Sequence, residues 1–145
     1  MKRTLSILLL SLVTFASVAA TLRIEGEDAT SSDVNPHSWY RAVRRGELSG
    51  DDYLAHFSEQ KTGTASYRFE VKDAGDYTFH LRANPTRASL RYRLDGGEWT
   101  KIDTEHARDV RNIAADDKFD LRFIGWIEVG SLELSAGEHT LSFRF

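Results

Sequence analysis

The aromatic side chains of this 145-residue chain, three of them tryptophan, are its best candidates for binding a ligand. Sugar recognition needs flat rings that stack on the apolar C–H face of a pyranose, with planar polar groups nearby for the hydroxyls. Trp39 and Tyr40 lie in an irregular segment, where binding residues are often carried. They could form such a platform, or they could pin the segment to the fold, because aromatic rings bury large areas. Trp99 follows a turn and is more typical of hairpin support or core.

Trp126 belongs to an alternating stretch at residues 119–129. The alternation places Trp126 on the face opposite the apolar one, together with Arg122 and Glu128. A tryptophan away from the core invites a partner. The alternative is that a bulge at Gly125 turns the ring inward, or that a neighbouring loop covers it.

A row of hydrogen-bonding side chains, His80, Arg82 and Asn84, shares the outward face of another expected strand. Such a row could line a sugar cleft, although solvation alone would also explain it. Three cations, Arg41, Arg44 and Arg45, follow Tyr40 in the sequence. This group could favour uronate or sulfated polymers through charge-assisted hydrogen bonds.

Catalytic motifs do not occur in the chain. A glycosidase needs two carboxylates held a set distance apart in a cleft, and no pair here has a context that marks it out. The Gly-x-Ser-x-Gly, His-Glu-x-x-His and phosphate-loop motifs are missing from the sequence. His80, Arg82 and Tyr92 could imitate the set that a jelly-roll lyase uses, but Tyr92 is expected to point inward. We therefore expect the chain as given to be non-catalytic.

Residues 1–20 are typical of a secretion signal. Lys2 and Arg3 precede an apolar run that ends in small residues, where a signal peptidase would cut before Thr21. Removal of the signal leaves 17 of the 19 Lys and Arg residues against 22 Asp and Glu residues, a net charge of −5. This balance disfavours nucleic acid and anionic membranes as partners. With no cysteine to form disulfides, the remaining domain is still large enough to build a core, and we expect it to be secreted or periplasmic.

Residues 21–145 read as one all-β domain, because apolar and polar residues alternate in most segments. Asp95-Gly96-Gly97 has the composition of a tight hairpin turn. Two similar phrases, at 69–82 and 132–144, each read as strand, tight Ala-Gly turn, strand. A short helix is expected between Asn35 and Gly46. Strands are expected at 22–26, 53–57, 64–72, 77–84, 90–94, 98–102 and 119–129, and a loop at 103–117.

This pattern predicts an antiparallel two-sheet β-sandwich of jelly-roll type. The sequence stops at Phe145 inside an alternating strand, which predicts a closing strand and further domains beyond it. The alternative is that 141–145 is simply the last strand of a small protein.

Four motifs taken together resemble the calcium-dependent β-sandwich carbohydrate-binding modules, and more narrowly the module-like domains at the N-termini of secreted agarases and other glycoside hydrolases. They are Ile24-Glu-Gly-Glu-Asp28, Ala74-Gly-Asp-Tyr-Thr78, Tyr92-Arg-Leu-Asp-Gly-Gly-Glu-Trp99 and Leu134-Ser-Ala-Gly-Glu-His-Thr-Leu141. The resemblance implies a galactose-binding-like jelly roll, a polysaccharide ligand held by loops or a concave face, and a covalently linked catalytic domain downstream.

The resemblance also implies a structural Ca²⁺ near the first strand, with Glu25 and Glu27 as ligands. Residues two apart on a strand share a face, and calcium prefers several hard oxygen ligands. The alternative is two carboxylates on a solvated edge. The function expected from the sequence is thus a non-catalytic sugar-binding module, with a structural or adhesive β-domain and a jelly-roll lyase as alternatives.

Overall fold

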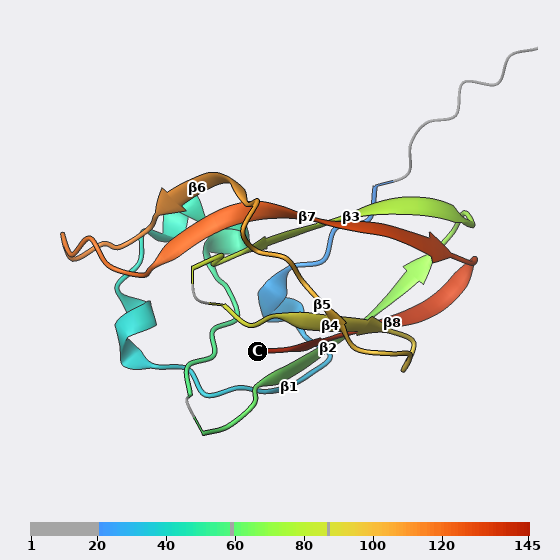
Figure 1. Cartoon of the computed structure of the whole chain (residues 1–145), viewed down its shortest axis with the longest axis horizontal. Helices are drawn as coiled ribbons and strands as arrows, with labels where there is room; N and C mark the ends of the chain where they lie inside the picture. The colour runs from blue at the N-terminus through green and yellow to red at the C-terminus, as the bar shows by residue number, and fades with distance from the viewer. Residues whose placement is uncertain (1–20, 59, 87) are drawn as a thin grey trace, which may run out of the picture.

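The computed structural model describes residues 21–58, 60–86 and 88–145, without the side chain of Trp39. The secretion signal expected at residues 1–20 lies outside the described residues. The described chain is a sandwich of two antiparallel sheets (Figure 1). No α-helix occurs in the described ranges, and four short 3₁₀ turns are the only helical segments there. The predicted all-β, two-sheet architecture is confirmed.

The larger sheet has five strands in the order β1 (Ser31–Asp33), β2 (Thr64–Val71), β8 (Gly137–Arg144), β4 (Arg91–Leu94) and β5 (Thr100–Lys101). The smaller sheet has three strands in the order β3 (Gly75–Ala83), β7 (Phe123–Leu134) and β6 (Arg108–Asn112). The 3₁₀ turns are η1 (Gly26–Asp28), η2 (Ser38–Arg41), η3 (Arg45–Glu47) and η4 (Ser49–Asp51). All four precede β2, so the described segment from residue 21 to the start of β2 is mostly irregular.

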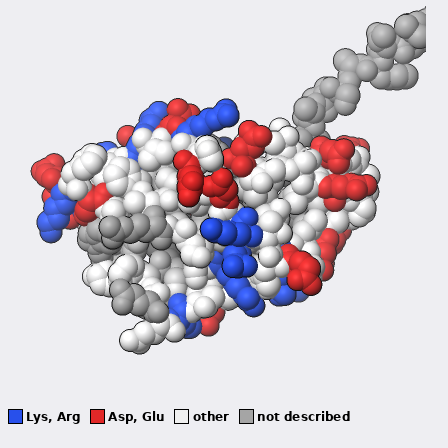
Figure 2. All heavy atoms as spheres, in the orientation of Figure 1, with Lys and Arg blue, Asp and Glu red and all other residues white. Residues whose placement is uncertain are grey.

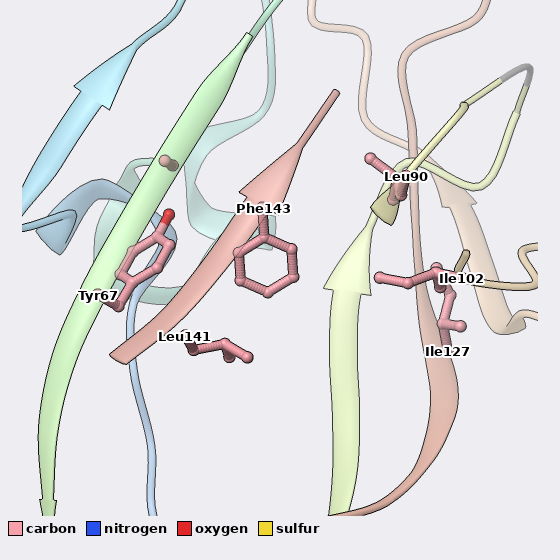
Figure 3. Packing of buried hydrophobic residues seen from close by; sticks show 7 residues of the cluster. Tyr67, Leu90, Ile102, Ile127, Leu141 and Phe143 are labelled. Carbon is pink, nitrogen blue, oxygen red and sulfur yellow. The ribbon is translucent and has the colours of Figure 1, made fainter. Parts of the chain in front are cut away.

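The core fills the space between the two sheets (Figure 3). Tyr67 and Phe143, from neighbouring strands of the larger sheet, meet edge to face with ring centroids 5.8 Å apart. Phe79 of the smaller sheet meets Tyr92 of the larger sheet in the same way at 5.4 Å. Such contacts join the two layers, and each large apolar side chain that is fully buried stabilises the fold by about 1.5–3 kcal/mol. The buried members of this core are Ala65, Tyr67, Leu90, Ile102, Ile127, Leu141 and Phe143.

The two repeated phrases are crossovers between sheets, and the hairpins predicted for them are wrong. β2 pairs with β8 and β3 pairs with β7, so each Ala-Gly turn carries the chain from one sheet to the other. Alternation and turn composition look the same in a hairpin and in a crossover, because both join two strands that are buried on one face. The two copies therefore pair with each other: Val71 lies opposite Gly137, and Gly75 lies opposite Leu134.

The hairpin predicted at Asp95-Gly96-Gly97 is confirmed. Asp95 and Gly96 have φ values of 49° and 72°, which is the pattern of a type I′ turn. β4 pairs with β5 across it. Strands 64–72 and 77–84 are also confirmed, as β2 and β3.

Other predictions for local structure are wrong. Neither 22–26 nor 53–57 forms a strand, and the helix expected between Asn35 and Gly46 is replaced by 3₁₀ turns. At the end of segment 22–26, the backbone N–H of Asp28 bonds to the carbonyl of Glu25 and closes a turn. The Tyr67 hydroxyl donates to the Gly26 carbonyl in the same turn at 2.7 Å. These contacts hold the segment to the core without strand pairing. The expected loop at 103–117 contains β6.

Candidate functional site

The outer face of the three-stranded sheet carries the candidate site. Trp126 lies in β7, the middle strand, with Arg82 of β3 and Arg108 of β6 as its partners on either side. Trp126 is 46% exposed, so the ring faces outward and Gly125 does not turn it into the core. The guanidinium carbon of Arg82 lies 5.7 Å from the centroid of the ring. An aromatic plate between two cationic side chains can stack on a sugar and bond its hydroxyls.

Arg82 is held in place by the 3₁₀ turn η3. Its Nη2 donates to the Glu47 carbonyl at 2.8 Å, and Arg82 is half-buried. The Glu47 carboxylate in turn lies 3.5 Å from Nη1 of Arg111. A guanidinium has five N–H donors, so the hydrogen bond to Glu47 leaves Arg82 with donors for a ligand beside Trp126.

One half of this outer face is covered by chain. Ile124 lies two residues before Trp126 in β7 and therefore shares its face. It packs with Tyr53 against a small second core formed by Val43, Leu48 and Ile113. Tyr53 belongs to this second core and Leu54 to the main core, so the irregular N-terminal segment bridges the two. Trp126 thus lies at the border where the covered half of the sheet becomes open.

Arg122 does not lie on this face with Trp126, and the prediction that it points outward is wrong. Its side chain is fully buried, because β7 begins only at Phe123 and the strand alternation does not extend to residue 122. Its guanidinium bonds Asp120 at 2.8 and 2.5 Å, Asp116 at 2.5 Å and the Ala42 carbonyl at 2.7 Å. These hydrogen bonds, first those from Asp120, raise the pKa of Arg122, and the guanidinium lowers the pKa of Asp116.

His80 and Asn84 have different surroundings. His80 is exposed in β3 opposite Glu128, one row along the sheet from Arg82 and Trp126. Asn84 follows the end of β3, where its side-chain amide donates to the Leu121 carbonyl at 2.6 Å and accepts from the Thr86 N–H at 2.9 Å. Asn84 therefore fixes loops at the end of the strand, whereas His80 extends the outward row.

Tyr40 lies in η2 and is half-buried. Its carbonyl accepts a hydrogen bond from the Tyr53 hydroxyl, and its ring lies 6.4 Å from that of Phe57. Burial, with a contribution from Asp120, raises the pKa of the Tyr40 hydroxyl. These contacts favour the pinning role over a free platform. The side chain of Trp39, the other half of the predicted pair, lies outside the described residues.

A hollow runs along β3, the edge strand of the smaller sheet. Its lining includes side chains of the outer face and also core residues such as Tyr67 and Phe143, so the hollow reaches around the edge of β3 into the space between the sheets. Five side chains predicted to bind ligand line it: Tyr40, His80, Arg82, Asn84 and Trp126.

The two predicted calcium ligands, Glu25 and Glu27, do not lie on a strand. Glu25 precedes η1 and Glu27 lies within it. The Glu25 carboxylate accepts from Nε of Arg23 at 2.7 Å and from Ser49 Oγ at 2.8 Å. In the described part of the chain no three acidic, His or Cys side chains gather as a metal-binding group. Calcium takes six to eight oxygens, so backbone carbonyls or water would have to supply most of them.

The expected basic group at Arg41, Arg44 and Arg45 is largely used within the chain. Arg44 donates to the carbonyls of Ala114 and Asn112, and Arg45 donates to the Asp51 carbonyl and lies 3.2 Å from Asp52. Arg44 and Arg45 therefore hold the irregular segment to its neighbours, whereas Arg41 is exposed.

No family model matches the chain, and no curated protein is significantly similar to it. Among the described residues, no helix has the length and apolar character needed to cross a membrane.

Proposed function

We propose that this domain is a non-catalytic carbohydrate-binding module that holds a polysaccharide against Trp126. The observation that carries the proposal is the half-exposed indole in the middle of a sheet, with Arg82 and Arg108 on either side. A pyranose stacked on the ring would have hydroxyls within reach of guanidinium donors and of His80. A polymer is favoured over a monosaccharide because the outward row continues from Arg82 to His80, one row along the sheet from the ring.

The proposal includes a secreted or periplasmic location and a linked catalytic domain, both expected from the sequence. A module of this kind acts by raising the effective concentration of its partner domain on the polymer. A structural Ca²⁺ at Glu25 and Glu27 is part of the proposal on the strength of the resemblance alone.

The lyase alternative is disfavoured by the arrangement of its three candidate residues. His80 and Arg82 lie on the outer face of the smaller sheet, whereas Tyr92 belongs to the larger sheet and packs on Phe79 in the core. The three side chains therefore do not converge on one substrate. A structural or adhesive β-domain remains the second candidate, because the same ring could pack on another protein.

Affinity electrophoresis against a panel of neutral and acidic polysaccharides tests the proposal. We expect at least one polymer to retard the wild-type domain and Trp126→Ala to weaken that binding by at least about tenfold, as loss of one stacked ring implies. Arg82→Gln should weaken it less, about three- to tenfold, since one hydrogen bond is lost.

Phe119→Ala is the matched control. Phe119 is 86% exposed and does not line the hollow, so its removal takes away an exposed ring without touching the candidate site. A folded Trp126→Ala domain that binds as well as the wild type would contradict the site. A wild-type domain that no polymer retards would favour the adhesive alternative.

A further inference from the structure

A second cluster of functional groups lies on the outer face of the five-stranded sheet, on the opposite side of the sandwich from Trp126. It consists of Trp99 and the cations Arg91, Arg93, Lys101 and Arg144, which we call the cationic patch. Strand alternation places these side chains outside, because Leu90, Ile102 and Phe143, their neighbours in sequence, are buried in the core. Figure 2 shows Lys and Arg gathered over β4, β5 and β8, with Asp and Glu on either side.

The cations of the patch lie opposite one another on neighbouring strands. Arg91 lies directly opposite Arg144 of β8 on one side and opposite Lys101 of β5 on the other. Like charges directly across a strand pair destabilise a sheet, and they do so here in a domain whose overall charge is negative. An anion between these side chains would convert the repulsion into attraction.

The side-chain donors of the three arginines in the patch have no acceptor among the described residues. The hydrogen bonds and ion pairs of the described residues include none from the side chains of Arg91, Arg93 or Arg144. Nε of Arg93 is the one buried side-chain nitrogen or oxygen of the described residues that lacks a hydrogen-bond partner. A buried donor without an acceptor is costly. The two terminal nitrogens of the same guanidinium are not buried in this way, so they are the Arg93 donors that a ligand can reach.

Trp99 orders two of these guanidinium groups. The guanidinium carbons of Arg93 and Arg144 lie 4.6 and 4.2 Å from the centroid of its ring. A guanidinium that lies on an aromatic face keeps its N–H groups in its own plane, where they remain available to an oxyanion. Planar, fixed donors of this kind bind carboxylate or sulfate oxygens in pairs. Trp99 thus contacts β4 through Arg93 and β8 through Arg144, and it positions their donors.

We propose that the cationic patch is a second binding surface, specific for the anionic groups of a polysaccharide, either sulfate esters or uronate carboxylates. The ligand oxygens bond to Arg93 and Arg144, with Arg91 and Lys101 supplying further charge. The patch spans three neighbouring strands, about 10 Å, which is enough for one or two anionic groups and too short to follow a nucleic-acid backbone. This surface is independent of the proposed site at Trp126.

Affinity electrophoresis or calorimetry with defined polymers tests this surface at physiological salt. The probes are dextran sulfate, unmodified dextran, polygalacturonate and its methyl ester. We expect binding to at least one anionic polymer and at least about tenfold weaker binding to its uncharged counterpart. The preferred polymer tells sulfate from carboxylate. R93Q/R144Q should lose at least about tenfold in affinity, because two charge-assisted hydrogen-bonding groups are removed.

The matched control is K72Q/K118Q, which changes the net charge equally at two exposed positions outside the patch. It should bind within about twofold of the wild type. Equal losses in both double variants would show general charge attraction and overturn the proposal, as would a wild-type domain that ignores both anionic polymers. Tighter binding to a single-stranded DNA oligonucleotide than to either polymer would also overturn it.

A third variant separates this surface from the one proposed above. Trp126→Ala should leave binding of the anionic polymer unchanged if the patch is the receptor, and R93Q/R144Q should leave binding of a neutral polymer unchanged. Loss of anionic binding in Trp126→Ala, with R93Q/R144Q unaffected, would assign that ligand to the first site and overturn the proposal. Melting temperatures of all variants establish that they are folded.

Discussion

Nδ1 of His139 lies 2.7 Å from Oδ2 of Asp95, and this contact fixes the β4–β5 turn to β8. Asp95 also accepts the backbone N–H of Thr140 at 2.7 Å through Oδ1. The other ring nitrogen of His139 lies 2.9 Å from the Ser135 carbonyl. Both ring nitrogens thus face acceptors, which suits the doubly protonated imidazolium. The hydrogen bond to Asp95, followed by that to Ser135, raises the pKa of His139, whereas the Thr140 and His139 contacts, against a desolvation effect, lower the pKa of Asp95.

This pair predicts how stability depends on pH. Because the pKa of His139 is higher in the folded chain than in the unfolded chain, its protonated form stabilises the fold. This stabilisation is complete below about pH 6.5 and is lost as the pH rises through the raised pKa. The lowered pKa of Asp95 stabilises the fold above about pH 3.8, and this is lost as pH falls through the lowered value. We expect the melting temperature to decrease as the pH rises above about 6.5, and His139→Gln to reduce that decrease. An unchanged pH profile in His139→Gln would contradict the assignment.

Arg122 predicts a large effect on stability at a position where the sequence suggests a solvated residue. Its side chain is fully buried, and Arg122→Met would leave Asp120 and Asp116 without their cation. Losing one partner of a fully buried pair costs about 3–5 kcal/mol. The two acids keep 22% and 31% of their side chains exposed, so we expect about 2–3 kcal/mol by urea unfolding. Arg111→Met, which removes an exposed pair, should cost less than about 1 kcal/mol.

The sequence predicts the strands of this fold better than their partners. Alternation identifies β2 and β3 because their inner residues bury the core, and Asp95-Gly96 identifies the β4–β5 hairpin because its positive φ values need those residue types. Nothing local to residues 72–75 tells a crossover from a hairpin, since the difference is which sheet receives the next strand. The pairing of the two repeated phrases is therefore visible only in three dimensions.

Strand alternation also predicts part of the candidate site. Trp126 and Arg82 lie inside regular strands, so their outward direction follows from period two. Arg122 and Asn84 lie just outside strand ends, where alternation no longer holds, and both bond to loops distant in sequence. The cationic patch could not be predicted from the sequence. Its members come from the loop before β5 and from β4, β5 and β8, and the order of the strands in the sheet brings them together.

The calcium proposal predicts that adding Ca²⁺ to metal-free protein raises its melting temperature, because a ligand that binds only the folded state stabilises it. At a Ca²⁺ concentration tenfold above Kd, the expected stabilisation is about 1.4 kcal/mol. The ion pair between Arg23 and Glu25 competes with calcium and therefore raises the Kd. The double variant Glu25→Gln with Glu27→Gln should abolish the rise, and Glu98→Gln, at an exposed position, should keep it. No change at millimolar Ca²⁺ in scanning fluorimetry would remove the cation from the proposal.

Gly125 connects the packing of the smaller sheet to the Trp126 site. A Cβ atom at this position would lie 2.9 Å from Cγ2 of Val110 and 3.1 Å from the Arg108 carbonyl oxygen. The oxygen belongs to the backbone of β6 and cannot rotate away, so Gly125→Ala should push β6 from β7. Overpacking of this kind costs about 1–3 kcal/mol, and it would also displace Arg108 from the side of Trp126.

Two further variants separate the contacts of Gly125. Adding Val110→Ala removes the side-chain clash but leaves the carbonyl contact, so the pair should recover only part of the stability lost in Gly125→Ala. Gly46→Ala is the control, because a Cβ at Gly46 meets nothing within 4 Å and should change the free energy of unfolding by less than about 0.5 kcal/mol. If urea unfolding gave Gly125→Ala and Gly46→Ala the same stability, the close approach of β6 to β7 at Gly125 would not be the constraint described here.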